Sequence, residues 1–486
     1  MTLEPVIGLE VHVQLKTKSK LFCRCATTYG AEPNSNICPI CCGHPGVLPL
    51  LNRDVVELVV RAGLGLGCKI TRDSVFARKQ YFYPDLPKAY QISQYDLPIV
   101  QNGTLAITGA DGKTKTVRIH RIHLEEDAGK LLHAVGAREL DYSLVDLNRA
   151  GIPLAECVSE PDLSTPEEAY AYLTALKQVF QYLDISDCDM EKGSLRCDAN
   201  ISLRPVGHKT LGTKAEIKNL NSFKAVKESL HYEIKRQHEV LNAQGRIIQE
   251  TRLWDDARQV TVSMRSKEQA HDYRYFPEPD LVPIHVDDAF LDRIRQSLPE
   301  LPDRKKQRFM NDLKLSDYDA GVLVASRELA TYFETALDTA GAENAKPVCN
   351  WISTELLGRL NAAGKTIEES PITPKNLAGL VSLVQKGTIS GKTAKDVFAE
   401  MFDTGGAPDG IVKAKGLLQV GDEATIAKWC DEAIAEMPKA VAEYQAGKER
   451  AIGSIVGLVM KKSQGKANPQ LANQLLAKKL AALKPS

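Results

Sequence analysis

Residues 7–15 read Ile-Gly-Leu-Glu-Val-His-Val-Gln-Leu, and this stretch decides how the first part of the chain folds. Every odd position carries an apolar residue, whereas the even positions carry Gly8, Glu10, His12 and Gln14. Successive side chains of a strand point to opposite faces, so the pattern predicts a strand with one buried face. Glu10 and His12 then lie together on the other face.

Three further segments repeat this alternation, at residues 117–127, 195–204 and 213–219. A solvated sheet face is the simpler interpretation of any one strand. The polar faces nevertheless combine carboxylates with cations, at Glu125, Glu126, Asp198, Glu216, Arg196, Lys214 and Lys218. Converging carboxylates bind Mg²⁺ through oxygen, and neighbouring Lys and Arg neutralise phosphate oxygens. The four strands together therefore predict a cradle for ATP and Mg²⁺.

Four cysteines have the spacing of a zinc site. Cys23-x-Cys25 is followed, twelve residues later, by Cys38-x-x-Cys41. Two close pairs separated by a loop can supply four thiolates, which predicts a closed, structural Zn²⁺ site in an insertion at residues 23–42. The alternative is a set of free thiols, and Cys42 could substitute for Cys41. Since the chain has 11 cysteines, most of them scattered, a disulfide framework is not expected.

Residues 79–94 interleave aromatic residues with lysine and show no regular apolar period. Such a segment can stack on bases and pair with phosphates, as recognition of a single-stranded RNA end requires. The alternative is a loop packed by its own tyrosines. The candidate contacts to a substrate, ATP or an RNA end are Lys79, Tyr81, Tyr83, Lys88 and Tyr90.

Composition sets the class of protein. Of the 486 residues, 62 are Lys or Arg and 62 are Asp or Glu. This balance excludes a protein that coats nucleic acid with a surface that is basic overall. No apolar run reaches the length of a membrane span, and the N-terminus has no signal-peptide pattern. We expect a cytoplasmic protein that does not bind a membrane.

The pattern of the chain changes twice. Residues 1–295 combine strands with a few helices, expected at 52–67, 166–182 and 222–244, and predict an α+β domain. Residues 296–405 predict an all-helical domain, and residues 406–486, after a Gly/Pro-rich break, a small helical tail.

Two shorter signals lie in the helical part. Residues 387–393 resemble a phosphate-binding loop that is one residue short, so we interpret them as a turn and a helix N-cap. The last 36 residues contain six lysines and no acid, which fits either a solvated helix face or contacts to the phosphate backbone of a nucleic acid.

Eight segments, in order, resemble the B subunit of the tRNA-dependent aspartyl/glutamyl amidotransferase (GatCAB). They are residues 6–13, 81–94, 124–130, 145–154, 158–162, 193–202, 216–222 and 272–280. The helical part, with Asn376-Leu-Ala-Gly and Ala467-Asn-Pro-Gln-Leu, resembles the helical and YqeY-like tail domains of that family. The resemblance covers essentially the whole chain.

The resemblance implies a glutamine-synthetase-like cradle and a ligase of protein biosynthesis. ATP would phosphorylate the side-chain carboxylate of Glu on tRNA(Gln) or of Asp on tRNA(Asn), and ammonia would then give Gln-tRNA or Asn-tRNA. The glutaminase, or A, subunit would deliver the ammonia, and the small C subunit would complete the heterotrimer. The sequence leaves open which of the two charged tRNAs is used.

The resemblance also implies roles for particular residues. It places the Mg²⁺ ligands at Glu10, His12, Glu125 or Glu126, Asp198 and Glu216. It adds ATP or tRNA-end contacts, which we assign to Arg149, Arg196, Lys214 and Lys218. Two alternatives remain: a zinc-stabilised tRNA-binding protein without its own catalysis, and an ATP-dependent ligase that acts on a free amino acid.

Overall fold

The computed structural model describes residues 2–109, 112–136, 138–266, 273–418, 422–463 and 466–483. Backbone contacts divide the chain into two units, Met1–Pro302 and Asp303–Ser486, and each is described by itself. Asp272, which opens the last of the eight resembling segments, lies outside the described residues, as do residues 419–421, 464–465 and 484–486 of the predicted tail.

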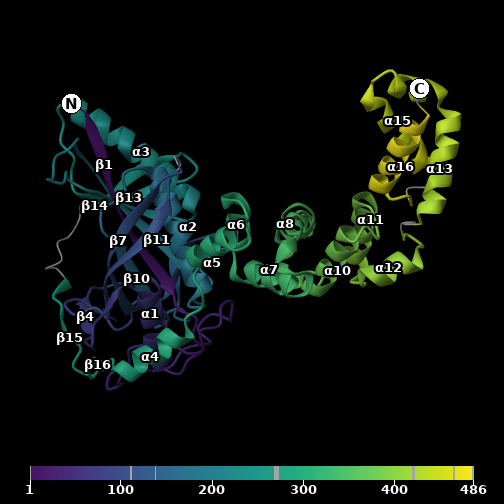
Figure 1. The fold of residues 1–486 in the computed structure, drawn as a ribbon. Helices are drawn as coiled ribbons and strands as arrows, with labels where there is room; N and C mark the ends of the chain where they lie inside the picture. The colour runs from purple at the N-terminus through teal and green to yellow at the C-terminus, as the bar shows by residue number, and fades with distance from the viewer. Residues whose placement is uncertain are drawn as a thin grey trace. The chain divides into compact units, whose positions relative to one another are not determined.

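A nine-stranded sheet forms the centre of the first unit (Figure 1). In spatial order its strands are β14 (Val260–Ser266), β13 (Glu250–Asp255), β12 (Ala215–Leu220), β11 (Leu195–Pro205), β1 (Leu3–Gln14), β10 (Pro153–Ser159), β7 (Thr114–Glu126), β6 (Val100–Thr108) and β2 (Lys69–Ile70). Neighbouring strands are antiparallel except β12 and β13. This mixed sheet with helices confirms the coarse α+β prediction, whereas the glutamine-synthetase-like arrangement stays a prediction.

The apolar face of the sheet carries the core, as the alternation predicts. The odd-numbered residues from Ile7 to Leu15 are all buried, and so are the apolar residues of β11. Two helices, α2 (Pro166–Tyr182) and α3 (Phe223–Asn242), contact the sheet and each other and add residues such as Leu173 and Phe180 to the same core. Each fully buried Leu, Val or Phe side chain contributes about 1.5–3 kcal/mol. The opposite face is left for polar side chains.

Smaller elements surround the sheet. Helix α1 (Arg53–Gly65) contacts β6 and α4 (Asp288–Ser297). The short strands form three small sheets: β15 (Phe276–Pro277) with β4 (Ala77–Gln80) and β5 (Tyr90–Ser93), β16 (Ile284–His285) with β3 (Asp73–Ser74), and β8 (Lys130–Val135) with β9 (Arg138–Asp146).

The three helices expected in the first domain are confirmed. Each begins where the sequence supplies an N-cap: the side chains of Asn52, Thr165 and Ser222 accept backbone N–H groups of α1, α2 and α3. Such caps satisfy donors that the first turn of a helix leaves unpaired.

The second unit is helical throughout its described residues. Its α-helices are α5 (Pro302–Asn311), α6 (Asp317–Leu323), α7 (Arg327–Ala340), α8 (Ala345–Asn350), α9 (Leu357–Ala362), α10 (Pro374–Gln385), α11 (Gly391–Thr404), α12 (Pro408–Ala414), α13 (Glu423–Glu436), α14 (Pro438–Gln445), α15 (Ile452–Lys462) and α16 (Pro469–Ala482). A π-helical stretch, Trp351–Leu356, joins α8 to α9. The side chain of Ser390 caps α11, which confirms that residues 387–393 form a turn and a helix N-cap.

The second unit contains two separate apolar cores. One runs from Phe309 to Val412, and the other from Ile426 to Leu480. Helix α12 lies beyond the predicted boundary at residue 405, yet Ile411 and Val412 belong to the first core. The change of core therefore falls after α12, and the division between the units falls at Pro302, a few residues after the predicted boundary at 295.

Across the described ranges, no helix has the length and apolarity that a membrane span requires.

Candidate active site

The polar face of the sheet carries a cavity of about 360 Å³, which we call the acidic cavity. Five adjacent strands, β12, β11, β1, β10 and β7, supply its acidic and histidine side chains. It is lined by Glu10, His12, Lys79, Gln94, Tyr95, Arg121, His123, Glu156, Asp198, Glu216, Lys218, Thr251, Tyr273 and Tyr275.

One group of potential metal ligands is His12, Glu125 and Glu156, whose ligand atoms lie within 4.8 Å of one another. His12 Nε2 is 3.3 Å from Glu156 Oε2 and 3.5 Å from Glu125 Oε1. Register explains the meeting, because His12 on β1 lies directly opposite Glu156 on β10. Burial would lower the pKa of His12, but Glu156 and then Glu125 raise it to about 9. Without a bound cation the imidazolium therefore balances one of the two carboxylate charges of this group.

A second group of potential ligands is Glu10, Asp198 and Glu216, also within 4.8 Å of one another. Glu10 lies opposite Asp198 in the β1–β11 register. Lys218 forms an ion pair with Asp198 and lies 3.5 Å from Glu216 Oε1. Mg²⁺ prefers about six oxygens at about 2.0–2.1 Å, so the three carboxylates of the second group and Glu125 and Glu156 of the first are donors of the preferred kind, whereas His12 offers a nitrogen. The six predicted Mg²⁺ residues thus fall into two groups, with Glu126 elsewhere.

Alternation along β7 separates Glu125 from Glu126. Glu125 points toward His12, whereas Glu126 forms an ion pair with Lys88 and accepts the backbone N–H of Ile92. Successive side chains of a strand must lie on opposite faces, so the two cannot share one site. Of the two alternatives, the structure brings only Glu125 to the other predicted ligands.

The aromatic segment at residues 79–94 divides between two places. Lys79 lines the acidic cavity, with its ammonium 5.1 Å from the ring centre of Tyr273 and 5.9 Å from that of Tyr81. Lys88 and Tyr90 line a separate small cavity next to Cys23 and Cys41. Tyr83 is 51% exposed and does not line the acidic cavity.

Arg149 and Arg196, both predicted to contact ATP or the tRNA end, instead bind the loop that follows β7. Arg196 Nη2 lies 3.0 Å from Asp127 Oδ1, and Arg149 Nε lies 3.6 Å from Asp127 Oδ2. Arg149 also donates to the carbonyl oxygens of Ala128 and Gly129. These contacts fix the loop, and neither arginine lines the acidic cavity.

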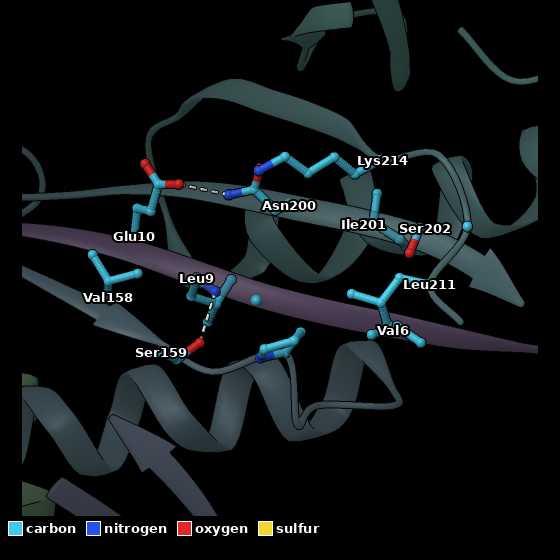
Figure 2. Close-up of a pocket in the computed structure, with 13 residues that line it drawn as sticks. Val6, Leu9, Glu10, Val158, Ser159, Asn200, Ile201, Ser202, Leu211 and Lys214 are labelled. Atoms are coloured by element: carbon cyan, nitrogen blue, oxygen red, sulfur yellow. Dashed lines mark hydrogen bonds between the residues drawn. The ribbon is translucent and has the colours of Figure 1, made fainter. Parts of the chain in front are cut away.

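A second cavity, of about 230 Å³, adjoins the acidic cavity and shares Glu10 with it (Figure 2). Lys214, the last predicted contact residue, lines this second cavity. Asn200 donates to Glu10 Oε1 at 2.8 Å, while its buried Oδ1 has no hydrogen-bond partner. Most of the other residues that line this second cavity are apolar, so we call it the apolar cavity. Its apolar lining includes Val6, Leu9, Val158, Pro161, Ile201 and Leu211.

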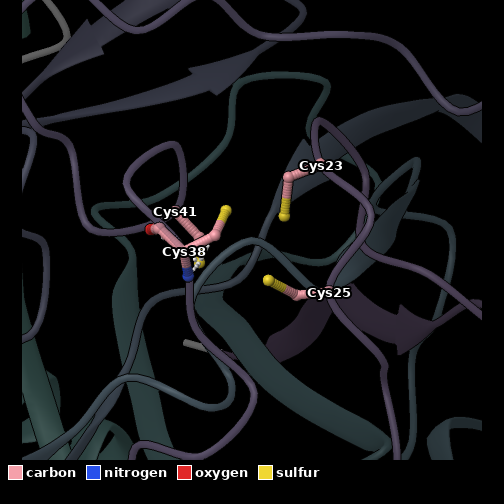
Figure 3. Close-up of side chains that lie close together, drawn as sticks. All are labelled: Cys23, Cys25, Cys38 and Cys41. Carbon is pink, nitrogen blue, oxygen red and sulfur yellow. Dashed lines mark hydrogen bonds between the residues drawn. The ribbon is translucent and has the colours of Figure 1, made fainter.

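The four predicted zinc ligands converge (Figure 3). The sulfur atoms of Cys23, Cys25, Cys38 and Cys41 all lie within 4.8 Å of one another, and Cys23 and Cys41 are buried. A tetrahedral site with Zn–S bonds of about 2.3 Å has sulfur–sulfur edges of about 3.8 Å, so this set fits zinc. Hydrogen bonding with Cys23, and then the N–H of Cys38 and the charge of Lys20, lower the pKa of Cys41.

Reasoning from alternation missed several lining residues. One sequence feature could have indicated Glu156: it is the only charged residue among residues 153–159, which form β10. His123 and Arg121 lie on a strand whose alternation is less regular than that of β1. Tyr273 and Tyr275 follow β14 without any periodic pattern, so only the tertiary structure brings them to the cavity.

Comparison with known families identifies the class of protein to which the chain belongs. Residues 5–292 match the GatB/GatE catalytic domain, and residues 331–480 match the GatB domain. These matches cover the large sheet of the first unit and most of the helices of the second.

Three full-length relatives are named as the B subunit of aspartyl/glutamyl-tRNA(Asn/Gln) amidotransferase. The protein of Carboxydothermus hydrogenoformans is 57% identical over 480 residues, 99% of either chain. That of Geobacter sp. (strain M21) is 56% identical, and that of Thermoanaerobacter pseudethanolicus 55%, each over 99% of this chain and 100% of the relative. The chain belongs to the family of amidotransferase B subunits, which confirms the resemblance.

Proposed function

We propose that this chain carries the ATP-dependent half of tRNA-dependent amidation. In this reaction the γ-phosphoryl group of ATP is transferred to the side-chain carboxylate of Glu on tRNA(Gln) or Asp on tRNA(Asn). Ammonia then displaces the phosphate and leaves the amide. The single observation that carries the proposal is the acidic cavity. In it, the two groups of potential metal ligands described above lie beside Lys79, Lys218 and Arg121.

The two groups of potential metal ligands would be the binding sites for divalent cations. His12, Glu125 and Glu156 would hold one Mg²⁺, and Glu10, Asp198 and Glu216 would hold another or the same ion with its waters. Bound there, Mg²⁺ would neutralise charge on the phosphate oxygens. The chain itself provides the alternating strands that hold six ligands on one face.

The cations of the cavity position the reacting groups. Burial would lower the pKa of Lys79, but Glu125 and other neighbouring groups raise it above its ordinary value, so this lysine stays protonated. A half-buried ammonium is suited to hold a phosphate or the acceptor carboxylate, two anions that repel each other in water. Lys218, paired with Asp198, supplies a second such charge.

The apolar cavity is suited to the nucleoside of ATP. Its walls are aliphatic, which favours a flat purine ring, and Glu10 joins it to the acidic cavity. The unpartnered Oδ1 of Asn200 offers an acceptor to a base or ribose donor. With the base there, the phosphates would extend toward the second acidic group.

Ammonia must come from elsewhere. Among the described residues that line the acidic cavity, none is a cysteine or serine that could act as a glutaminase nucleophile. A partner glutaminase, the A subunit, would supply it, held to this chain by the small C subunit. The assembled heterotrimer would act in the cytoplasm, where charged tRNA is used.

Zinc at the four cysteines would be structural, since a full thiolate set leaves no open coordination position. The helical tail, residues 406–486, would bind the body of the tRNA. Not all the tail lysines are available for this: Lys462 pairs with Glu432 and Glu436, and Lys479 with Asp431.

An ATPase assay of the assembled complex tests the proposal. We expect ATP hydrolysis to rise when Glu-tRNA(Gln) or Asp-tRNA(Asn) is added, and not with uncharged tRNA or the free amino acid. Equal stimulation by free Glu or Asp would point to a ligase for a small substrate. Full activity in an Asp198→Asn variant would point to catalysis outside this chain.

A further inference from the structure

Lys20 is a fully buried lysine beside the cysteine site. Its backbone N–H donates to the carbonyl oxygen of Cys25 at 3.0 Å, so it is held against the first cysteine pair. A Cβ atom placed on Gly151 would lie 3.5 Å from Lys20 Cδ and 3.6 Å from Cys41 Cβ, so Lys20 and Cys41 both pack around this glycine, and the charge of Lys20 is among the groups that lower the pKa of Cys41. Lys20 is therefore bonded to the backbone of the first cysteine pair and shares Gly151 as a neighbour with Cys41 of the second pair.

The ammonium of Lys20 has little else to interact with. Its one hydrogen bond is a long one, 3.3 Å, to the carbonyl oxygen of Leu147. Within the described part of the chain no carboxylate lies within 4 Å of it, in contrast to Lys88 and Lys218, which both pair with acids. An unpaired buried charge is costly, by several kcal/mol. The fold tolerates this cost only if an anion is close by.

Charge counting identifies that anion. Four thiolates and one Zn²⁺ carry a net charge of about −2 in a half-buried setting. We propose that Lys20 is the built-in counter-cation of the metal–thiolate centre, and that its positive charge, rather than its shape, strengthens metal binding there. This inference rests on the zinc assignment made above. The coupling is reciprocal: loading the metal also stabilises the buried ammonium.

The test is zinc affinity in the full-length chain, measured by competition with a chromophoric chelator. Lys20→Gln removes the charge and keeps a donor for the Leu147 carbonyl, whereas Lys20→Met removes both. Because changes around the ligands of a metal typically cost 10–100-fold in affinity, we expect both variants to bind zinc about 10–100-fold more weakly. The exposed neighbour Lys18 provides the control, and Lys18→Gln should change the affinity less than about twofold.

A second readout follows the thiolates directly. In Co²⁺-loaded protein, the sulfur-to-cobalt charge-transfer absorption should appear for each variant, at higher Co²⁺ concentrations for the two Lys20 variants. If Lys20→Met does not fold, Lys20→Gln alone decides. Zinc affinity of Lys20→Gln equal to that of the unmodified chain would overturn the proposal. Failure of the unmodified chain to bind zinc would overturn the zinc assignment itself, and this inference with it.

Discussion

Glu156 shares one carboxylate between two imidazoles, those of His12 and His123, each 3.3 Å from its Oε2. Burial would raise its pKa, but the two histidines hold the pKa of this carboxyl well below its ordinary value. It is therefore an anion at neutral pH, placed where a divalent cation is expected.

Replacing Glu156 with Gln should lower ATP-dependent transamidation at least about 100-fold, because the change keeps the shape and removes the charge at the cation site. The measurement is amide formation on charged tRNA by the assembled complex. Glutamine hydrolysis by the partner should persist. The matched control is Glu160→Gln, since Glu160 pairs with His120 at an exposed position. Equal losses in both variants would contradict a role in the site.

Glu233 offers a stability test outside the site. Its carboxylate is fully buried and meets Arg236 at 2.8 Å and Arg252 at 3.0 Å. Burial would raise its pKa, but the bonds from Arg236 and Thr261 outweigh that effect and lower it. A lowered pKa means that the group stabilises the fold above its unfolded value, about 4.3, and loses this contribution as the pH falls through the folded value.

Glu233→Gln should therefore destabilise the first unit by about 3–5 kcal/mol at pH 7, because it removes the buried carboxylate that pairs with Arg236 and, beside Glu250, with Arg252. The difference from the unmodified chain should shrink below about pH 4. Urea unfolding followed at several pH values checks both. Glu228→Gln, which removes an exposed pair with Lys224, should cost less than about 1 kcal/mol. If the difference in free energy of unfolding between Glu233→Gln and the unmodified chain stays constant down to about pH 3, the assigned role is contradicted.

The residues of the site were predictable where alternation governs them. Glu10 and His12 share a face because they are two apart, and Asp198 and Glu216 follow the same rule on β11 and β12. Glu156 was not predictable in this way, since both faces of β10 are buried and its flanking residues are apolar. Its partner is set by register with β1, which joins residues far apart in the sequence.

At the scale of elements, the loop that carries the four cysteines is attached to the turn after β9. The side-chain amide of Asn34 donates to the carbonyl oxygen of Val145, and its side-chain oxygen accepts the N–H of Leu147. Asn148 donates back to the carbonyl oxygen of Glu32. The cysteine loop thereby holds the segment that presents Arg149.

Cys38→Ser should lose zinc and lower the thermal midpoint of the first unit more than it alters the ATP-dependent step. The reason is that a closed thiolate site contributes to folding and not to chemistry. Metal analysis of protein purified under reducing conditions checks this. Cys42 lies next to the site but outside the set of four, so Cys42→Ser should retain zinc. Zinc loss in Cys42→Ser with retention in Cys38→Ser would contradict the ligand assignment.

Elements with local signals were predictable, and those with distant partners were not. Helix α2 agrees with its prediction at both ends, because Thr165 caps it and Pro166 starts it. By contrast, β4 and β5 lie in a segment whose irregular pattern predicts no strand. Their third strand, β15, comes from residues 276–277, and this pairing leaves no signal near residues 79–94.

At the scale of the whole molecule, the helical part contains two separate apolar cores, and the second of them lies nearer the C-terminus. Because α12 packs into the first of them, removal of residues 406–486 should expose that core and reduce solubility. Removal of residues 419–486 takes away only the second core.

The shorter deletion should raise the KM for charged tRNA several-fold and make it less sensitive to salt, since phosphate contacts release counterions. ATP binding should remain nearly unchanged. Steady-state kinetics at two salt concentrations and equilibrium ATP binding provide the check. An equal loss of ATP affinity would contradict a role limited to tRNA.

The central claim is that the acidic cavity of this chain transfers a phosphoryl group to the amino-acid side chain of a charged tRNA. The most direct measurement uses ATP labelled at the γ-phosphate and the complete complex without glutamine or ammonia. We predict labelled Glu-tRNA(Gln) or Asp-tRNA(Asn), whose label is released as phosphate when ammonia is added, and none with Asp198→Asn. Two results would contradict the claim. One is amide formation by the Asp198→Asn variant at the rate of the unmodified complex, and the other is amide formation by the unmodified complex without any transfer of the label to the charged tRNA.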